Sequence, residues 1–264
     1  MPIQLVVCDM DGTLFLKDEV MPAFAGEFSR RLAERGIRFA VATGRSLPMA
    51  RRFVDALKPT APCVYANGAL IRSPERVVEA HRVPLAPLRD TLDEALEMGM
   101  SVIVNWDDRE DFVLRHTPWT LDQRKRFGVY ETAYYPTEDE WRTQGAYKLM
   151  VKDPGHRIQQ VCDRLERLSD RCAYVQYETG ATEIMARGLN KARGVLQLAA
   201  ALDIPPSDVM AIGDFYNDIE MMSAVGTGVA VGNAIDEVKR HAKYVCQGPY
   251  AYGVREIVEK LCAE

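Results

Sequence analysis

Short apolar runs alternate with helix-like segments at both ends of this chain, and no other feature constrains its fold as strongly. The run Ile3–Cys8 contains a single polar residue, as expected of a strand buried on both faces of a sheet. Strands that alternate with helices form a parallel sheet wrapped by helices. We therefore expect a Rossmann-like, doubly wound α/β core built from both ends of the chain. Its expected strands are Ile3–Cys8, Arg38–Thr43, Cys63–Ala66, Val209–Ile212 and Thr227–Val231.

The middle of the chain follows a different pattern. Two helix-like segments, Pro87–Met98 and His156–Leu168, are separated by stretches in which polar and apolar residues alternate, as in antiparallel strands. We interpret residues 81–187 as an inserted α+β cap domain, and residues 1–80 together with 188–264 as one discontinuous core. The 264 residues suffice for two domains of modest size.

The composition excludes several classes of protein. With 33 Lys and Arg against 38 Asp and Glu, the net charge is −5, which argues against a nucleic-acid partner. No apolar stretch approaches the ~18 residues of a membrane span, and the first residues do not resemble a signal peptide. The six cysteines contain no C-x-x-C pair, so we expect no structural zinc site. We expect reduced cysteines and a cytoplasmic location.

Two aspartates follow the first expected strand directly, in the sequence Asp9-Met10-Asp11-Gly12-Thr13. Ligands of open parallel sheets bind beyond the carboxyl ends of the strands. Carboxylates that converge there repel each other unless a cation compensates their charge. A solvated loop explains an isolated D-x-D equally well, so this motif gains weight only in combination with others.

Three other polar segments occupy comparable places. Thr43-Gly44-Arg45 follows a strand and combines a hydroxyl, a flexible backbone and a guanidinium group, which suits an anion. Lys191 begins a helix, where a cation is mildly unfavourable and therefore indicates another task. Gly213-Asp214-Phe215-Tyr216-Asn217-Asp218 adds two carboxylates and an amide after a later strand. A turn, a surface lysine or a helix cap would explain each segment alone, but four at the strand ends of one sheet indicate a common site.

Mg²⁺ fits a site of this kind, because it prefers oxygen ligands and typically binds one or two carboxylates together with a substrate phosphate. Carboxylates, a metal ion, a hydroxyl and an ammonium group are the components of phosphoryl transfer. In that reaction, catalysis consists mainly of positioning and charge neutralisation. The residues therefore favour an enzyme that transfers or hydrolyses phosphoryl groups.

The four segments, in this order, resemble the four motifs of the haloacid dehalogenase superfamily. Three further segments are similar to its Cof-type branch, whose class IIB cap lies between the second and third motifs, and the resemblance covers essentially the whole chain. The four motifs are D-M-D-G-T at Asp9–Thr13, Thr43, Lys191 and G-D-F-Y-N-D at Gly213–Asp218. The segments of the branch are A-T-G-R at Ala42–Arg45, N-G-A at Asn67–Ala69 and G-V-A-V-G-N-A at Gly228–Ala234.

The resemblance implies a Mg²⁺-dependent phosphatase that works through an aspartyl-phosphate intermediate. Asp9 would be the nucleophile. Asp11 would protonate the leaving alcohol and then activate the water that releases phosphate. Asp9, the main-chain carbonyl of Asp11 and Asp214 would hold Mg²⁺.

Five further residues receive roles from the same resemblance. Thr43 and Lys191 would bind phosphoryl oxygens, together with backbone amides near Gly44. Asn217 would contact the phosphate or the substrate. Asp218 would orient the residues that hold the metal.

We expect the substrate to be a small phosphorylated metabolite, most simply a sugar phosphate, because a cap closes over the site and excludes macromolecules. Arg45, Arg115, Lys148 and Glu183 are candidates to face the substrate, although surface solvation explains each equally well. We expect a monomer or a weak homodimer, without nucleic-acid or membrane partners.

Three alternatives are left open by the residues. One is a non-catalytic protein of the same fold that binds sugar phosphates. A phosphomutase of the same superfamily would share the core motifs, so Asp9 and Asp11 do not distinguish it from a phosphatase. A receiver-like signalling protein also carries a phosphorylated aspartate beside a threonine, a lysine and Mg²⁺. Receivers are shorter, however, and lack an inserted domain.

Overall fold

The computed structural model describes residues 3–16, 20–107, 109–155, 157–177 and 180–263. The chain forms two compact units. Among the residues described, none of the helices has the length and apolar character that a membrane span needs. All six cysteines are free thiols. Unit 1 comprises Met1–Arg45, Ala50–Glu79 and Asn190–Glu264, and unit 2 comprises Ser46–Met49 and Ala80–Leu189.

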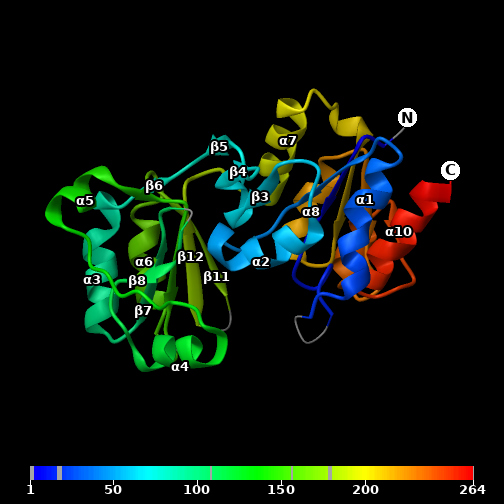
Figure 1. Ribbon diagram of the computed structural model, residues 1–264. Coiled ribbons are helices and arrows are strands. Elements are labelled where there is room, and N and C mark those ends of the chain that lie inside the picture. Colours follow the sequence, from blue (N-terminus) through cyan, green and yellow to red (C-terminus); the bar gives the residue numbers. More distant parts are fainter. Residues whose placement is uncertain (1–2, 17–19, 108, 156, 178–179, 264) are drawn as a thin grey trace. The chain divides into compact units, whose positions relative to one another are not determined.

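Unit 1 is built on a five-stranded parallel sheet (Figure 1). Its strands stand in the order β15-β14-β13-β1-β2, so the first strand of the chain lies inside the sheet, between β13 and β2. β1 pairs with both β13 and β2 and is buried along its whole length, which explains its apolar sequence. The bounds are β1 Leu5–Cys8, β2 Arg38–Val41, β13 Val209–Gly213, β14 Thr227–Ala230 and β15 Tyr244–Val245.

Helices cover both faces of this sheet. α1 packs beside α10 on one face, and α7 packs beside α8 on the other (Figure 1). Beyond β2, a bridge between Ala42 and Val64 leads to a small antiparallel sheet of β3, β4 and β5. The helices are α1 Phe28–Ala33, α2 Leu47–Leu57, α7 Lys191–Ala201, α8 Tyr216–Ser223, α9 Asp236–His241 and α10 Ala251–Ala263, and the small sheet comprises β3 Cys63–Tyr65, β4 Leu70–Arg72 and β5 Val77–Ala80.

Unit 2 is built on a five-stranded antiparallel sheet with the order β11-β12-β10-β7-β8. On one face, Val102 and Ile184 join the apolar residues of α3 and α6 in the main core of the unit. On the other face, Ile103 and Val113 form a small cluster with Tyr130. The bounds are β6 Val83–Pro84, β7 Ser101–Asn105, β8 Phe112–Val113, β9 Gly145–Ala146, β10 Lys148–Lys152, β11 Ala173–Tyr177, β12 Ala181–Met185, α3 Arg89–Glu97, α4 Pro118–Phe127, α5 Glu138–Thr143 and α6 Gln159–Glu166.

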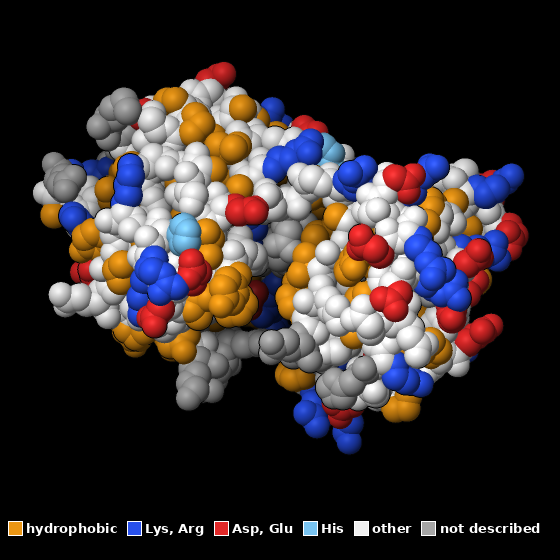
Figure 2. All heavy atoms as spheres, turned by 180° about the vertical axis from the view of Figure 1, so that it is seen from behind, with side chains coloured by type: hydrophobic (Ala, Val, Ile, Leu, Met, Phe, Trp, Pro, Cys, Tyr) orange, Lys and Arg blue, Asp and Glu red, His pale blue; other side chains and the backbone are white. Residues whose placement is uncertain are grey.

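The class of fold is the one that the sequence predicts, an α/β core with a parallel sheet and an inserted segment with antiparallel sheets. Short 3₁₀ helices connect some elements: η1 Ala23–Glu27, η2 Ala66–Gly68, η3 Ala86–Leu88 and η4 Pro206–Asp208. On the face seen in Figure 2, basic and acidic side chains are interspersed and do not form the continuous basic surface that is typical of nucleic-acid-binding proteins.

Candidate active site

The carboxyl ends of β1 and β13 bring three aspartates together. Asp9 directly follows β1, Asp214 directly follows β13, and Asp218 lies in the first turn of α8. One carboxylate oxygen from each residue lies within 4.8 Å of the other two, and all three residues are buried. β1 and β13 are parallel neighbours in the sheet. Parallel pairing therefore joins the first and the last of the four polar segments.

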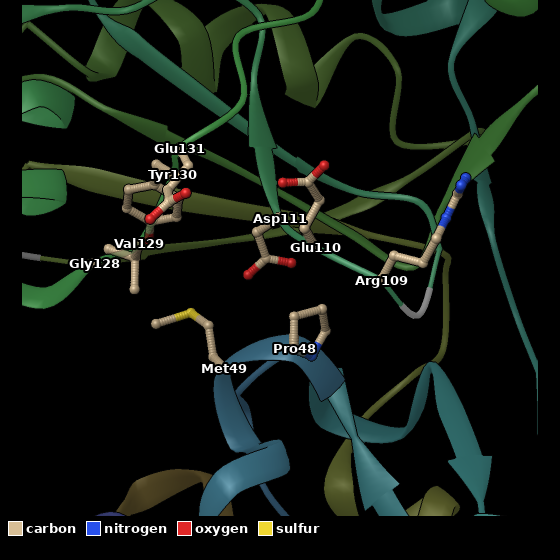
Figure 3. Close-up of a pocket in the computed structure, with 9 residues that line it drawn as sticks. All are labelled: Pro48, Met49, Arg109, Glu110, Asp111, Gly128, Val129, Tyr130 and Glu131. Atoms are coloured by element: carbon tan, nitrogen blue, oxygen red, sulfur yellow. The ribbon is translucent and has the colours of Figure 1, made fainter.

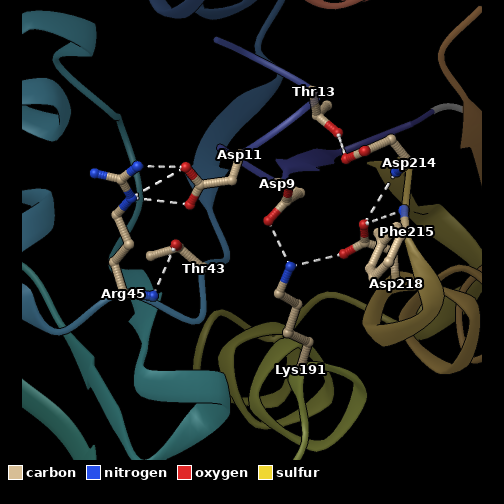
Figure 4. Close-up of polar contacts among 9 residues, drawn as sticks. All are labelled: Asp9, Asp11, Thr13, Thr43, Arg45, Lys191, Asp214, Phe215 and Asp218. Atoms are coloured by element: carbon tan, nitrogen blue, oxygen red, sulfur yellow. Dashed lines mark hydrogen bonds and ion pairs between the residues drawn. The ribbon is translucent and has the colours of Figure 1, made fainter. Parts of the chain in front are cut away.

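Lys191 supplies positive charge to this cluster (Figure 4). It is the first residue of α7, and its Nζ lies 2.5 Å from Oδ1 of Asp9 and 2.8 Å from Oδ1 of Asp218. Its side chain is only 2% exposed. Burial alone would lower the pKa of Lys191, but the carboxylates of Asp218 and Asp9 raise that pKa above its usual value. Lys191 is therefore a fixed positive charge between two aspartates.

Asp218 uses both of its carboxylate oxygens. Oδ1 accepts from Lys191, and Oδ2 accepts from the backbone N–H groups of Asp214, at 3.0 Å, and Phe215, at 3.1 Å. A Cβ on Gly213 would lie 2.4 Å from the Cβ of Asp218, so only glycine fits the turn that β13 makes into α8. Asp218 thus fixes the direction of both Lys191 and the Asp214 backbone.

Asp9 and Asp214 carry charge that is costly to bury. Burial raises the pKa of Asp9 well above its usual value, although Lys191 opposes the shift. Burial also raises the pKa of Asp214 to about 6, against the hydrogen bond that Thr13 donates to its Oδ1 at 2.7 Å. Together with Asp218, three carboxylates face one ammonium group. This set of hard oxygen donors, with an excess of negative charge, fits a divalent cation.

Asp11 points away from this cluster (Figure 4). Its half-exposed carboxylate forms a two-pronged ion pair with Arg45, in which Nε lies 2.9 Å from Oδ2 and Nη2 lies 2.5 Å from Oδ1. The Arg45 guanidinium also lies over the rings of Phe15 and Phe53, at 5.2 and 5.6 Å from their centroids. The sequence analysis names Arg45 as a candidate to face the substrate. In the structure, its guanidinium group forms an ion pair with the carboxylate of Asp11.

The remaining predicted residues fall into two groups. Thr43 follows β2, the other neighbour of β1, and its buried hydroxyl accepts from the N–H of Arg45 at 3.0 Å. Gly44 follows Thr43 in the same loop. Asn217 lies on the first turn of α8 with its side chain exposed, and no hydrogen bond joins that side chain to another described residue. Thr43 and Gly44 thus lie at the strand ends, and Asn217 lies at the surface.

Asn233, to which the sequence assigns no role in the site, holds the turn after Asp11 through a hydrogen bond to Gly12. Gly12 has φ +82°, and a Cβ there would lie 2.2 Å from Oδ2 of Asp214, so glycine is required. Its carbonyl oxygen accepts from Nδ2 of Asn233 at 2.8 Å, while Oδ1 of Asn233 accepts from the N–H of Tyr250 at 2.6 Å. Asn233 lies in the G-V-A-V-G-N-A segment that resembles the Cof-type branch. The segment does not show that the Asn233 side chain joins the loop at Gly12 to the loop at Tyr250.

The candidates in unit 2 have different surroundings. Lys148 and Glu183 form an ion pair at 2.7 Å, with 13% of each side chain exposed. The hydroxyl of Tyr177 donates to Glu183 at 3.2 Å. Arg115 donates instead to the carbonyl oxygen of Leu96, near the end of α3. Of these three candidates, Arg115 thus stabilises a helix terminus.

Unit 2 also contains a pocket of about 240 Å³ (Figure 3). The buried carboxylate of Asp111 lines it together with Met49 and Tyr130. Burial raises the pKa of Asp111, whose oxygens accept from Ser46 at 2.5 Å and Asn105 at 2.8 Å. Because both oxygens already have partners, this carboxylate has a structural role.

Comparisons with known proteins match almost the whole chain. The sequence model of the haloacid dehalogenase-like hydrolases matches residues 6–258. A phosphoglycolate phosphatase of Methanopyrus kandleri is 29% identical over 261 residues, which cover 98% of this chain and 97% of the relative. A haloacid dehalogenase-like hydrolase from Bacteroides thetaiotaomicron has a solved structure with a TM-score of 0.84 and 24% identity, over 98% and 99% of the two chains. A sugar phosphatase of HAD subclass IIB superposes with a TM-score of 0.74 and 18% identity, over 98% and 97%.

Proposed function

Because the chain belongs to the haloacid dehalogenase-like hydrolases, we propose that its buried aspartate cluster hydrolyses phosphate monoesters through a phosphorylated Asp9. The chain is a phosphatase of the Cof-type, class IIB branch. One observation carries the proposal: the Lys191 ammonium group is buried between Asp9 and Asp218, at the strand end where Asp214 also lies. A lysine held in this way can stabilise the charge of a phosphoryl group beside Asp9.

The residues of the cluster fit Mg²⁺. The carboxylates of Asp9 and Asp214 would hold the ion, together with the main-chain carbonyl of Asp11. The ion would supply neutralisation of the phosphoryl charge. Its binding would also offset the repulsion among the three buried carboxylates.

The reaction would proceed in two displacements. In the first, a carboxylate oxygen of Asp9 forms a bond to phosphorus, the bond to the ester oxygen breaks, and Asp11 gives its proton to the leaving alcohol. In the second, Asp11 takes a proton from water, the water oxygen bonds to phosphorus, and the bond to Asp9 breaks. Phosphate leaves, and both aspartates return to their starting state.

The surrounding residues would position the phosphoryl group. Lys191, the first residue of α7, and Thr43, which follows β2, would bind its oxygens, with the backbone near Gly44. Asn217, exposed on α8, would contact the substrate. Arg45 would hold Asp11 between turnovers, because it binds both oxygens of that carboxylate. Asp11 would leave this ion pair, with a proton taken from water, and turn toward Asp9 to act on the leaving group.

We propose small phosphorylated metabolites as substrates, with sugar phosphates as the leading class, and unit 2 as the cap that selects them. The Methanopyrus relative is named for phosphoglycolate and the subclass IIB relative for sugar phosphates, and both are small. The ion pair of Lys148 and Glu183 is the polar group of unit 2 that we assign to selection.

The test is release of inorganic phosphate from p-nitrophenyl phosphate and from a panel of small phosphate esters, with Mg²⁺ and with excess chelator. We expect release that depends on Mg²⁺ and differs in kcat/KM among the esters. Retention of phosphate on a sugar product would indicate a phosphomutase instead. A stable phosphorylated protein without turnover would indicate a receiver-like role, and full activity in chelator would contradict the assigned metal site.

A further inference from the structure

Ser46 connects the loop of the candidate active site to unit 2. The chain passes from one compact unit to the other between Arg45, which belongs to unit 1, and Ser46, which belongs to unit 2. The side chain of Ser46 is buried, and its hydroxyl donates to Oδ2 of Asp111 at 2.5 Å. A single peptide bond therefore joins the residue that pairs with Asp11 to a residue that Asp111 holds.

Asp111 is itself fixed in place. Its carboxylate lines the pocket of Figure 3 beside Met49, and its second oxygen, Oδ1, accepts from Nδ2 of Asn105 at 2.8 Å. Asn105, the last residue of β7, is also buried. A buried carboxylate is costly, and the hydrogen bonds from Ser46 and Asn105 offset part of that cost. Both bonds are therefore favoured strongly, and the position of Ser46 is well defined.

The backbone of Arg45 is held from the opposite side as well. Its N–H donates to the hydroxyl of Thr43 at 3.0 Å, and its carbonyl oxygen accepts from the N–H of Ala66 at 2.8 Å. That carbonyl belongs to the same peptide group as the N–H of Ser46. Arg45 is thus tied to unit 1 by its own hydrogen bonds and to unit 2 by its peptide bond to Ser46.

The side chain of Arg45 transmits this position to Asp11 (Figure 4). Its guanidinium group binds both carboxylate oxygens of Asp11 and lies over the rings of Phe15 and Phe53. A planar guanidinium that binds both oxygens fixes the orientation of a carboxylate as well as its distance. A displacement of the Arg45 backbone would therefore displace the resting position of Asp11.

We propose that Ser46 and Asp111 are positioning residues, which act through Arg45 and set the position from which Asp11 turns to give its proton to the leaving alcohol. The inference rests on the proposed phosphatase function and adds to it two residues of unit 2 that influence the proton transfer. Proton transfer requires hydrogen-bond distance between acid and leaving group, so a small displacement of Asp11 lowers the rate.

The test uses two esters whose leaving groups differ in their need for a proton. p-Nitrophenolate leaves as a stable anion and needs little help from a general acid, whereas the oxygen of ethanol must be protonated as it leaves. Since kcat/KM covers the reaction up to the departure of the leaving group, the ratio of kcat/KM for ethyl phosphate to that for p-nitrophenyl phosphate reports on Asp11 as an acid. Partial unfolding lowers both values alike and leaves this ratio unchanged.

Ser46→Ala removes the hydroxyl that Asp111 binds, and with Mg²⁺ present we expect it to lower the ratio about three- to tenfold. Asp111→Ala removes the same hydrogen bond from the other side and should lower the ratio to a similar extent. The matched control is Ser101→Ala, at the first residue of β7 in unit 2, where a buried hydroxyl lies 2.6 Å from Oγ1 of Thr117. This variant also loses a buried hydroxyl contact but should keep the native ratio.

A double variant tests whether Ser46 acts through Arg45. If it does, Arg45→Lys and Ser46→Ala disturb the same contact with Asp11, and the double variant should have a ratio close to that of the more affected single variant. Two independent effects would multiply instead.

Four results would overturn the proposal. These are a native ratio in Ser46→Ala, a native ratio in Asp111→Ala, an equally lowered ratio in the Ser101→Ala control, and multiplied effects in the double variant. Failure of the proposed function gives a different result, since the native protein would then release no phosphate even from p-nitrophenyl phosphate, and the roles of Ser46 and Asp111 would fall with it.

Discussion

Lys191 in unit 1 and Lys148 in unit 2 both pair with carboxylates, but the two pairs are built differently. Lys191 is 2% exposed and lies between two aspartates, one of which is also fixed by backbone N–H groups. Lys148 is 13% exposed and reaches Glu183 across two antiparallel strands. The first pair is part of a rigid set of charges at strand ends, and the second lies on the face of a sheet. In our proposal, this difference separates the residues that carry out the reaction, in unit 1, from the residues that select the substrate, in unit 2.

We expect the largest effect from the replacement of Asp9, the proposed nucleophile, which tests whether unit 1 carries out the reaction. Asp9→Asn keeps the size of the side chain but removes its nucleophilic oxygen, so we expect kcat to fall by roughly 10⁴-fold or more. Glu183→Gln, the matched change in unit 2, should alter kcat/KM unequally among substrates and leave turnover of the best substrate within about tenfold. Phosphate release measures both. An Asp9→Asn variant with activity near that of the native protein would contradict the assignment of the reaction to unit 1.

Removal of each lysine tests how strongly the two pairs contribute to stability. Lys191→Met leaves Asp9 and Asp218 buried without their counter-charge, and we expect the free energy of unfolding to fall by about 3–5 kcal/mol. Lys148→Met breaks a more accessible pair, so we expect a loss of about 1 kcal/mol. Urea unfolding of the two variants gives both values. Equal losses would show that the two pairs do not differ as described.

The pKa of Asp214 predicts how metal binding depends on pH. Because burial raises this pKa from 3.8 to about 6, the contribution of Asp214 to stability is complete below the unfolded value and is lost as the pH rises through about 6. Above that pH the ionised carboxylate is the form that binds Mg²⁺. Saturating Mg²⁺ should therefore raise Tm by several degrees near pH 7.5 and by much less near pH 5.

The control for this measurement is Asp214→Asn, in which the Mg²⁺-dependent rise in Tm should be small at both pH values. Asp111 in unit 2 is also a buried carboxyl with a raised pKa, but its oxygens are already bonded to Ser46 and Asn105. Asp111→Asn should leave the response to Mg²⁺ unchanged. A Mg²⁺ response that survives Asp214→Asn would place the metal elsewhere.

Arg45→Lys is expected to have the smallest effect. Lysine keeps the charge beside Asp11 but cannot bind both carboxylate oxygens with a planar fork. We expect kcat to fall about three- to tenfold, with KM changed little, because Asp11 is less well held before it turns to the leaving group. Arg52→Lys, a change at a neighbouring surface arginine on α2, is the control. A rise in KM alone would mean that Arg45 contacts the substrate instead.

The sequence predicts the strand ends of unit 1 well, because each apolar run there ends in a polar turn and parallel pairing puts those ends at one edge. In this way Asp9 and Asp214 could be predicted to lie together, and Lys191 joins them from the first position of α7. The directions in which the side chains point could not be predicted from the sequence. Nothing in D-M-D-G-T shows that Asp11 points to Arg45, and the A-T-G-R segment does not show that the following Ser46 donates to Asp111.

In unit 2 the sequence predicts the strands but not the partners of their side chains. Lys148 meets Glu183 only in the observed pairing of β10 with β12. A shift of one residue would move one of the two to the opposite face of the sheet, and the alternating pattern of short strands does not specify the register. The contact of Arg115 with the carbonyl of Leu96 likewise depends on how α3 ends, which charge alone does not reveal.

The place of β1 between β13 and β2 has a consequence for the synthesis of the protein. A ribosome that has added the first 190 residues has made Asp9, Asp11 and all of unit 2, but neither Lys191 nor the strand β13 that pairs with β1. Asp9 and Lys191 are 182 positions apart. Translation that stops early therefore yields Asp9 without the buried ammonium group beside it and β1 without its neighbour β13, and the cluster of aspartates and lysine is complete only when the last quarter of the chain has been made.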